Sequence, residues 1–157
     1  MTGLTCFKTY DIRGQLGIDL DEDIAYRIGR AFAQTLDVSK VVLGRDVRAS
    51  SEALAVSVAR GLIDAGCQVL DLGLSGTEEM YFATTYFEAD GGICVTASHN
   101  PMDYNGMKMV HAGSRPVSSD SGLTGIRDLV AANQFGEPGV FGKLKTLDHR
   151  ADYIKRL

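Results

Sequence analysis

Short apolar runs alternate along this chain with segments whose apolar residues recur every three or four positions. The runs are Lys40–Gly44, Cys67–Leu72 and Gly92–Thr96. Short apolar runs bounded by turn residues are typical of strands that are buried on both faces of a sheet. Strands that alternate with helices indicate an α/β layered domain with a largely parallel sheet.

The helical segments carry recognisable start and stop signals. Asp19–Glu22 has the form of a capping box, in which an acceptor side chain is followed three residues later by Glu. Ile24, Ile28 and Phe32 then recur every four residues and predict an amphipathic helix. Two further helices are expected before the last strand: one from Ser50 or Ser51 through Leu62 that ends at Gly66, and one from Thr77 to Tyr86. A strand is expected over Met107–Val110, beside the Gly92–Thr96 strand. A last helix is expected over Leu123–Ala132, capped by Asp120.

Composition narrows the class of protein. With 157 residues the chain is long enough for one domain with a core of its own. A net charge of −4 argues against a general nucleic-acid binder, and no apolar run approaches the roughly 20 residues that span a bilayer. Three cysteines without paired spacing are expected to be buried reduced thiols, which favours a cytoplasmic protein without a cysteine metal site.

The segment Thr96–Pro101, with the sequence TASHNP, follows the end of a predicted buried strand. Ligands bind at the carboxyl ends of strands in open α/β sheets, so Ser98 is a candidate for chemistry there. Ser, His, Asn and Pro are also common in ordinary turns, and the pattern by itself does not separate the two interpretations.

Two arginine-bearing segments offer anion ligands. Tyr10–Gly14 sets Arg13 beside a glycine, and Gly44–Arg48 places Arg45 and Arg48 between a strand and a helix. A guanidinium group presents a fork of donors that suits phosphate. A solvated turn, or a structural pair of Arg with Asp, fits these segments as well.

Together these segments resemble the phosphohexomutase family. TASHNP is similar to its phosphoserine loop, and Phe7–Gly14 (FKTYDIRG) is similar to its N-terminal signature. Asp103–Lys108 (DYNGMK) resembles the stretch that follows the serine loop, while Gly44–Arg48 and Ser75–Glu79 fit in the same order. The resemblance covers nearly the whole chain and implies a three-layer α/β/α sandwich with a mixed, largely parallel sheet. The nearest likeness is to bacterial phosphomannomutases that feed GDP-mannose synthesis.

The resemblance also implies roles for individual residues. Ser98 would carry the phosphoryl group and, once phosphorylated, give one oxygen ligand to Mg²⁺, the other ligands coming from another domain or from water. Lys108 would be the general acid/base, with Arg13 and His99 as alternatives, and Arg13 and Lys108 would offset the phosphoryl charge. Tyr10, Arg13 and Asn100 would contact the substrate, a hexose phosphate, with a hexose 1,6-bisphosphate as intermediate and activator.

Members of the family have four domains, and only the first resembles this chain. We therefore expect residues 1–147 to form the phosphoserine domain and residues 148–157 to begin an interdomain helix, capped by Asp148, that is cut short and frays. The partners would be the remaining domains, with no nucleic acid and no membrane, and His111 and His149 are expected at the surface. The fragment alone is expected to be inactive. A phosphoglucomutase or phosphoglucosamine mutase domain, a sugar-phosphate binding module without turnover, or a structural fragment whose serine is never phosphorylated remain alternatives.

Overall fold

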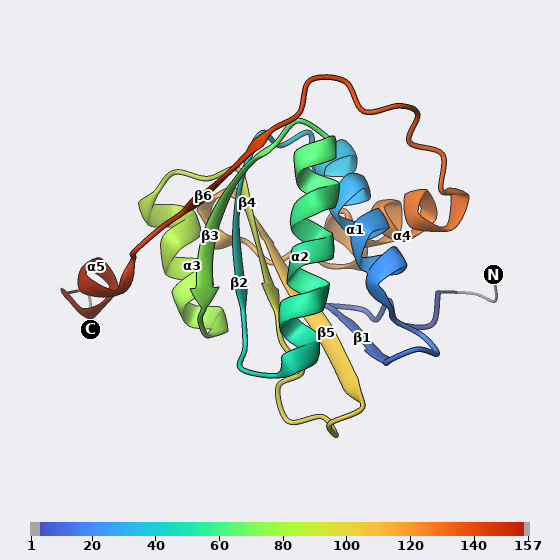
Figure 1. The fold of residues 1–157 in the computed structure, drawn as a ribbon, viewed down its shortest axis with the longest axis horizontal. Coiled ribbons are helices and arrows are strands. Elements are labelled where there is room, and N and C mark those ends of the chain that lie inside the picture. Colours follow the sequence, from blue (N-terminus) through green and yellow to red (C-terminus); the bar gives the residue numbers. More distant parts are fainter. Residues whose placement is uncertain (1–3, 156–157) are drawn as a thin grey trace.

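The strands form one mixed sheet in the order β1-β5-β4-β2-β3-β6 (Figure 1). The computed structural model describes residues 4–155. β4, β2, β3 and β6 run parallel, whereas β5 is antiparallel to both of its neighbours, β4 and β1. The expected largely parallel, mixed sheet is confirmed. The strands are β1 (Ile12–Gln15), β2 (Lys40–Arg45), β3 (Gln68–Leu74), β4 (Gly91–Val95), β5 (Tyr104–His111) and β6 (Lys143–Thr146).

Helices cover both faces of this sheet and give the three-layer α/β/α arrangement. One hydrophobic cluster joins the sheet to α1, α2 and α4. A second, smaller cluster joins the opposite face to α3 through Met80 and Ala83. The helices are α1 (Glu22–Leu36), α2 (Ala49–Asp64), α3 (Thr77–Tyr86), α4 (Leu123–Ala132) and α5 (Arg150–Lys155).

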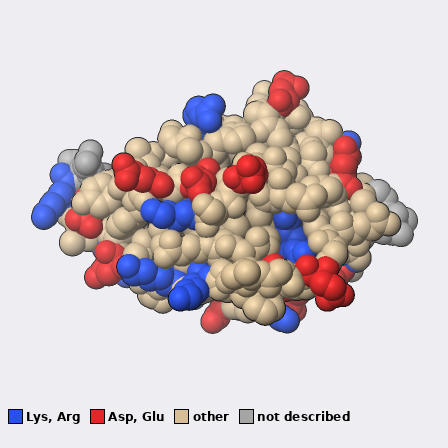
Figure 2. All heavy atoms as spheres, turned by 90° about the horizontal axis from the view of Figure 1, so that it is seen from above, with Lys and Arg blue, Asp and Glu red and all other residues tan. Residues whose placement is uncertain are grey.

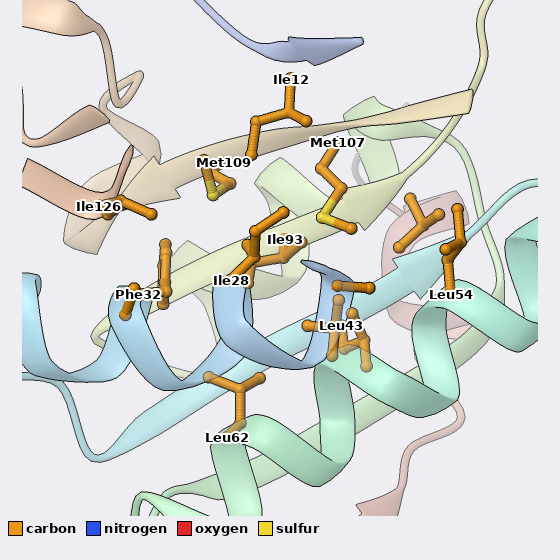
Figure 3. Packing of buried hydrophobic residues seen from close by; sticks show 14 of the residues in the cluster. Ile12, Ile28, Phe32, Leu43, Leu54, Leu62, Ile93, Met107, Met109 and Ile126 are labelled. Atoms are coloured by element: carbon orange, nitrogen blue, oxygen red, sulfur yellow. The ribbon is translucent and has the colours of Figure 1, made fainter. Parts of the chain in front are cut away.

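The central strands feed both clusters because successive side chains of a strand point to opposite faces. In β2, Val41 and Leu43 belong to the larger cluster, while Val42 between them belongs to the smaller one. Figure 3 shows side chains of the larger cluster from the sheet and from the helices converging on one core. The continuous apolar runs in the sequence follow from this burial on both sides.

Helix starts were predicted less well than helix positions. Asp21, not Asp19, caps α1 by accepting a hydrogen bond from the backbone N–H of Ile24 at 2.8 Å. Asp19 instead accepts hydrogen bonds from Thr5 and from the N–H of Gln15. Asp120 likewise does not cap α4, since it lies in a short 3₁₀ turn before Gly122.

α1 and α2 approach each other closely where two glycines meet. A Cβ atom on Gly61 would lie 2.2 Å from the Tyr26 carbonyl oxygen, and one on Gly29 would lie 2.4 Å from that of Val58. Neither backbone atom can move away alone, so this crossing requires glycine at both positions.

The segment after β6 differs from expectation. His149 is only 1% exposed and lies against Glu79 at the start of α3, so its placement at the surface was wrong. Tyr153 of α5 packs its ring edge-on against Phe82 of α3, at 5.5 Å between centroids. α5 thus contacts this domain. Residues 156–157 lie outside the described part of the chain, so the end of the helix expected over residues 148–157 does too.

Candidate active site

Ser98 lies on an exposed loop that joins the antiparallel strands β4 and β5, at the lower edge of Figure 1. This is the edge at which the parallel strands β2, β3 and β4 end. Ser98 has a left-handed backbone conformation, with φ of 52°, and its N–H donates to Thr96 Oγ1 at 3.1 Å. Residues other than Gly, Asn and Asp seldom adopt this conformation, so the surrounding structure must impose it.

The two residues after Ser98 differ in their contacts. His99 is exposed. Asn100 is partly buried, and its Nδ2 donates to the Ala97 carbonyl oxygen at 2.8 Å, while its own backbone N–H donates to the same oxygen at 3.0 Å. Asn100 therefore closes the turn around Ser98 with its side chain.

Asp46, directly after β2, lies beneath the start of the loop. Its Oδ2 accepts a hydrogen bond from the Ala97 N–H at 3.0 Å, and its Oδ1 accepts from the Ser51 hydroxyl and from the Arg48 N–H. Burial raises the pKa of this carboxyl group, but hydrogen bonds from Ser51, Ala97, Arg48 and Thr96 outweigh it and hold the pKa below its usual value. The group is therefore an anion at neutral pH.

Arg48 holds the far end of the same loop. Its Nη1 donates to the carbonyl oxygens of Pro101 at 2.6 Å and Tyr104 at 3.2 Å, and its Nη2 donates to that of Asn100. The guanidinium group is thus neither a free phosphate ligand nor a simple partner for an Asp side chain. Only its place after a strand, on the edge that carries Ser98, pointed to Arg48 in the sequence.

Three charged side chains meet where β1 lies beside β5. Lys108 Nζ lies 3.5 Å from Asp11 Oδ2, and Arg13 Nε lies 3.2 Å from Asp11 Oδ1. Lys108 pairs with Cys94 of β4, and Arg13 pairs with Gly106 of β5, so both cations leave the sheet on the face that α3 covers elsewhere. Lys108 is 37% exposed and Arg13 is 49% exposed, so both can reach a ligand. Asp11, which orients both, was not singled out from the sequence.

Tyr10 lies next to this group with its side chain 73% exposed. The structure thus brings the predicted residues into two neighbouring parts. One is the loop with Ser98, His99 and Asn100, and the other is the start of β1 with β5. The two parts meet where the N–H of Thr96 donates to the carbonyl oxygen of Gly106.

Donors for a metal ion are few. Among residues 4–155, no three His, Cys, Asp or Glu side chains lie close enough to hold one. The three cysteines are buried and free, as expected, and burial raises the pKa of the Cys94 thiol to about 12 and of the other two to about 11. Thiols of this kind neither ligate metals nor react readily.

One further face of the molecule carries charged side chains of both signs. Figure 2 views the end opposite the serine loop, where Lys and Arg are interspersed with Asp and Glu. This face, with its mixed charge, does not offer the basic stripe that nucleic acid requires. No described helix has the length and apolar character needed to cross a bilayer.

Comparison with known proteins gives concordant matches. The model of the family described as phosphoglucomutase/phosphomannomutase, alpha/beta/alpha domain I, matches residues 4–137. A Klebsiella pneumoniae protein named phosphomannomutase is 57% identical over 156 residues, which cover 98% of this chain and 99% of that protein. An Escherichia coli phosphomannomutase is 56% identical, and the match covers all of this chain but only 35% of that protein.

A solved structure agrees with the sequence matches. A phosphoglucomutase/phosphomannomutase family protein from Burkholderia thailandensis superposes with a TM-score of 0.89 at 35% identity, covering 99% of this chain and 36% of that one. The chain thus spans about a third of the length of these longer proteins.

Proposed function

Because the chain belongs to the phosphoglucomutase/phosphomannomutase family and corresponds to its alpha/beta/alpha domain I, we propose that it is the phosphoryl-carrying N-terminal domain of a phosphomannomutase. The observation that carries the proposal is Ser98. Its hydroxyl lies on an exposed loop at the carboxyl edge of the sheet, in a backbone conformation that the loop imposes, and Thr96 of this loop is hydrogen-bonded to Gly106 on the strand that carries Lys108.

In this proposal Ser98 stores the phosphoryl group between two half-reactions. The bond from phosphorus to Ser98 Oγ breaks as a bond forms to a hydroxyl oxygen of a hexose phosphate. The proton of that hydroxyl passes to a base, and Ser98 Oγ regains a proton. The resulting bisphosphate then returns its other phosphoryl group to Ser98. Such transfers depend on in-line positioning and on neutralising the charge of the transferring group.

Lys108 is the base and acid that we assign, and Arg13 offsets charge beside it. Both side chains are held by Asp11 and are partly exposed. A phosphoserine carries about −1.5 to −2 charges at neutral pH, so nearby cations stabilise it. His99 is the alternative acid or base, and Tyr10 and Asn100 are the further substrate contacts that we propose.

Mg²⁺ would supply additional charge neutralisation at the phosphoryl oxygens. This chain fits such an ion only in part. Phosphorylated Ser98 would offer one oxygen, and no group of three His, Cys, Asp or Glu residues among those described completes a site. The remaining ligands must then come from another domain of the longer protein or from water.

The substrate assignment rests on the relatives. The Klebsiella and Escherichia proteins are named phosphomannomutases. We therefore propose interconversion of mannose 6-phosphate and mannose 1-phosphate through a hexose 1,6-bisphosphate, in the cytoplasm, as a supply for GDP-mannose synthesis. The division into a domain of residues 1–147 and an interdomain helix from residue 148 belongs to the same proposal, as does the inactivity of the isolated chain.

Mass spectrometry tests the central claim. In a full-length enzyme that carries this domain, we expect an addition of about 80 Da that maps to Ser98 and returns on incubation with a hexose 1,6-bisphosphate. A Ser119→Ala variant, altered at a serine outside the loop, should still take up this mass, and a Ser98→Ala variant should not. An active enzyme without phosphate on Ser98 at any stage would refute the proposal.

A further inference from the structure

Both ends of the serine loop are held by one short segment of the chain. Asp46 Oδ2 accepts the N–H of Ala97, the residue directly before Ser98. Two residues beyond Asp46, Arg48 donates to carbonyl oxygens on the other side of the loop, among them that of Pro101 at 2.6 Å. The left-handed Ser98 thus lies between two anchors that come from the same turn between β2 and α2.

The Asp46 anchor is itself held from beneath. Its Oδ1 accepts the hydroxyl of Ser51 in the first turn of α2. Ser51 Oγ in turn accepts Nδ2 of Asn105 at 2.9 Å, and Asn105 is completely buried. Asn105 precedes Gly106, whose carbonyl oxygen receives the N–H of Thr96. The network therefore returns to the start of the loop and fixes it against both β5 and α2.

Arg48 is committed to this network. Both of its terminal nitrogens donate to loop carbonyl oxygens. A guanidinium group that binds main-chain oxygens fixes the path of the chain, because those oxygens belong to the backbone and not to a mobile side chain.

We propose that Asp46 and Arg48 are positioning residues that hold Ser98, and the phosphoryl group on it, in the orientation for transfer. This inference rests on the proposed role of Ser98 as the phosphoryl carrier. Neither residue touches the substrate, and both act through the backbone of the loop. A displacement of about 1 Å at a reacting group can lower the rate of the chemical step about 10²-fold.

Two conservative variants of a full-length enzyme that carries this domain test the proposal. Asp46→Asn keeps the shape of the side chain. Its amide NH₂ group, however, would face an N–H or O–H donor from which the carboxylate accepts a hydrogen bond. Arg48→Lys keeps the charge but loses the fork that reaches separate carbonyl oxygens. We expect each to lower kcat about 10- to 100-fold while KM stays within about twofold of the parent. Amide hydrogen exchange over residues 97–104 should accelerate.

A matched control exists within the chain. Arg30 also donates to two main-chain oxygens, those of Phe135 and Gly136, far along the chain from the serine loop. Arg30→Lys therefore makes the same replacement and loses the same kind of contact. We expect a lower Tm for this variant with kcat unchanged.

The outcomes separate this inference from the function on which it rests. If Ser98→Ala keeps the parent rate, the proposed function fails. If Ser98→Ala is inactive while Asp46→Asn and Arg48→Lys keep the parent kcat and loop exchange, the positioning role is wrong and the function stands. A rise in KM with kcat unchanged would overturn the inference by making these residues substrate ligands. Should Arg48→Lys fail to fold, Asp46→Asn decides.

Discussion

His149 Nε2 lies 2.5 Å from Oε2 of Glu79, and the imidazole ring is 1% exposed. The other carboxylate oxygen of Glu79 accepts the N–H of Gly76 at 3.0 Å, just before α3 begins. One carboxylate therefore joins the start of α3 to the segment that leads into α5.

His149→Ala should destabilise the domain by about 1–3 kcal/mol, because it leaves a buried gap and removes a partner of Glu79. Urea unfolding measures this loss. His111→Ala is the control, since His111 is less buried and its ring contacts only the Ser121 carbonyl oxygen among the bonds described. A His149→Ala protein as stable as the control variant would contradict the structure here.

The stability of the domain should fall in acid partly through Glu79. Burial raises the pKa of this carboxyl group, but the hydrogen bonds from Gly76 and His149 outweigh it and set the pKa below the ordinary 4.5. Because the pKa of Glu79 is lower in the folded state, its ionised form stabilises the fold. This contribution to the free energy of unfolding is present above pH 4.5 and is lost as the pH falls through the folded-state pKa. Glu79→Gln should flatten the pH dependence of unfolding below about pH 5, and Glu78→Gln, on the exposed side of the same turn, is the matched control variant.

Substitutions in the serine loop of the full-length enzyme should form a graded series. Ser98→Ala removes the only proposed store for the phosphoryl group, so kcat should fall by several orders of magnitude with substrate binding much less affected. His99→Ala and Asn100→Ala should cost roughly 10²-fold or less, because they remove one donor or loosen the turn. Steady-state kinetics of the variants measure the order of these losses in kcat. A Ser98→Ala enzyme that keeps a tenth or more of its rate would end the mutase hypothesis.

Asp11→Asn tests the paired cations. Asp11 binds both Lys108 and Arg13, so its neutral analogue should let both side chains drift from the site. We expect kcat of the full-length enzyme to fall about 10-fold or more. Lys108→Ala should fall further and should change the pH dependence of kcat, as loss of a general acid or base does. Unchanged pH profiles in both variants would transfer the proton-handling role to His99 or Arg13.

Gly61→Ala should loosen the crossing of α1 and α2. The added methyl group would lie 2.2 Å from the Tyr26 carbonyl oxygen, and the helices must separate to admit it. We expect a loss of about 1–3 kcal/mol in the free energy of unfolding, as overpacked sites show. Gly139→Ala, where a Cβ meets nothing within 4 Å, is the control and should not destabilise. Equal stability in the two variants would mean that α1 and α2 lie farther apart than the structure shows.

Periodicity predicted the central elements because their burial is visible in the residue types. Most residues of β2, β3 and β4 are apolar, and α1 keeps its apolar residues on one stripe. The edge strands β1 and β6 were not predicted, and in β6 no buried side chain marks the strand. β6 is exposed at every residue, so its place in the sheet depends on backbone hydrogen bonds to β3 and not on side chains.

Contacts between distant parts of the chain were beyond sequence reasoning. From the sequence, Asp19 and Asp21 are equally good candidates for the N-cap of α1. Asp21 caps the helix, whereas Asp19 accepts hydrogen bonds from Thr5 and Gln15 instead. Likewise, His149 is buried because Glu79, 70 residues earlier, faces it. The motif residues of the serine loop were found, whereas Asp11 is identified only by what it contacts, and Arg48 was found but its role as an anchor of the loop was not.

The antiparallel pairing of β4 with β5 has a consequence for the order in which the site forms. Ser98 and Lys108 are ten residues apart on one hairpin, and a loop this short closes at little entropic cost. Asp46 and Arg48 reach the same loop from about 50 residues away, across the whole α2–β3–α3 crossover. The two proposed reacting groups can therefore come together early in folding, while the loop that carries Ser98 becomes rigid only when the long-range contacts are complete. Unfolding should reverse this order, so the orientation of Ser98 should be lost before the hairpin that carries it.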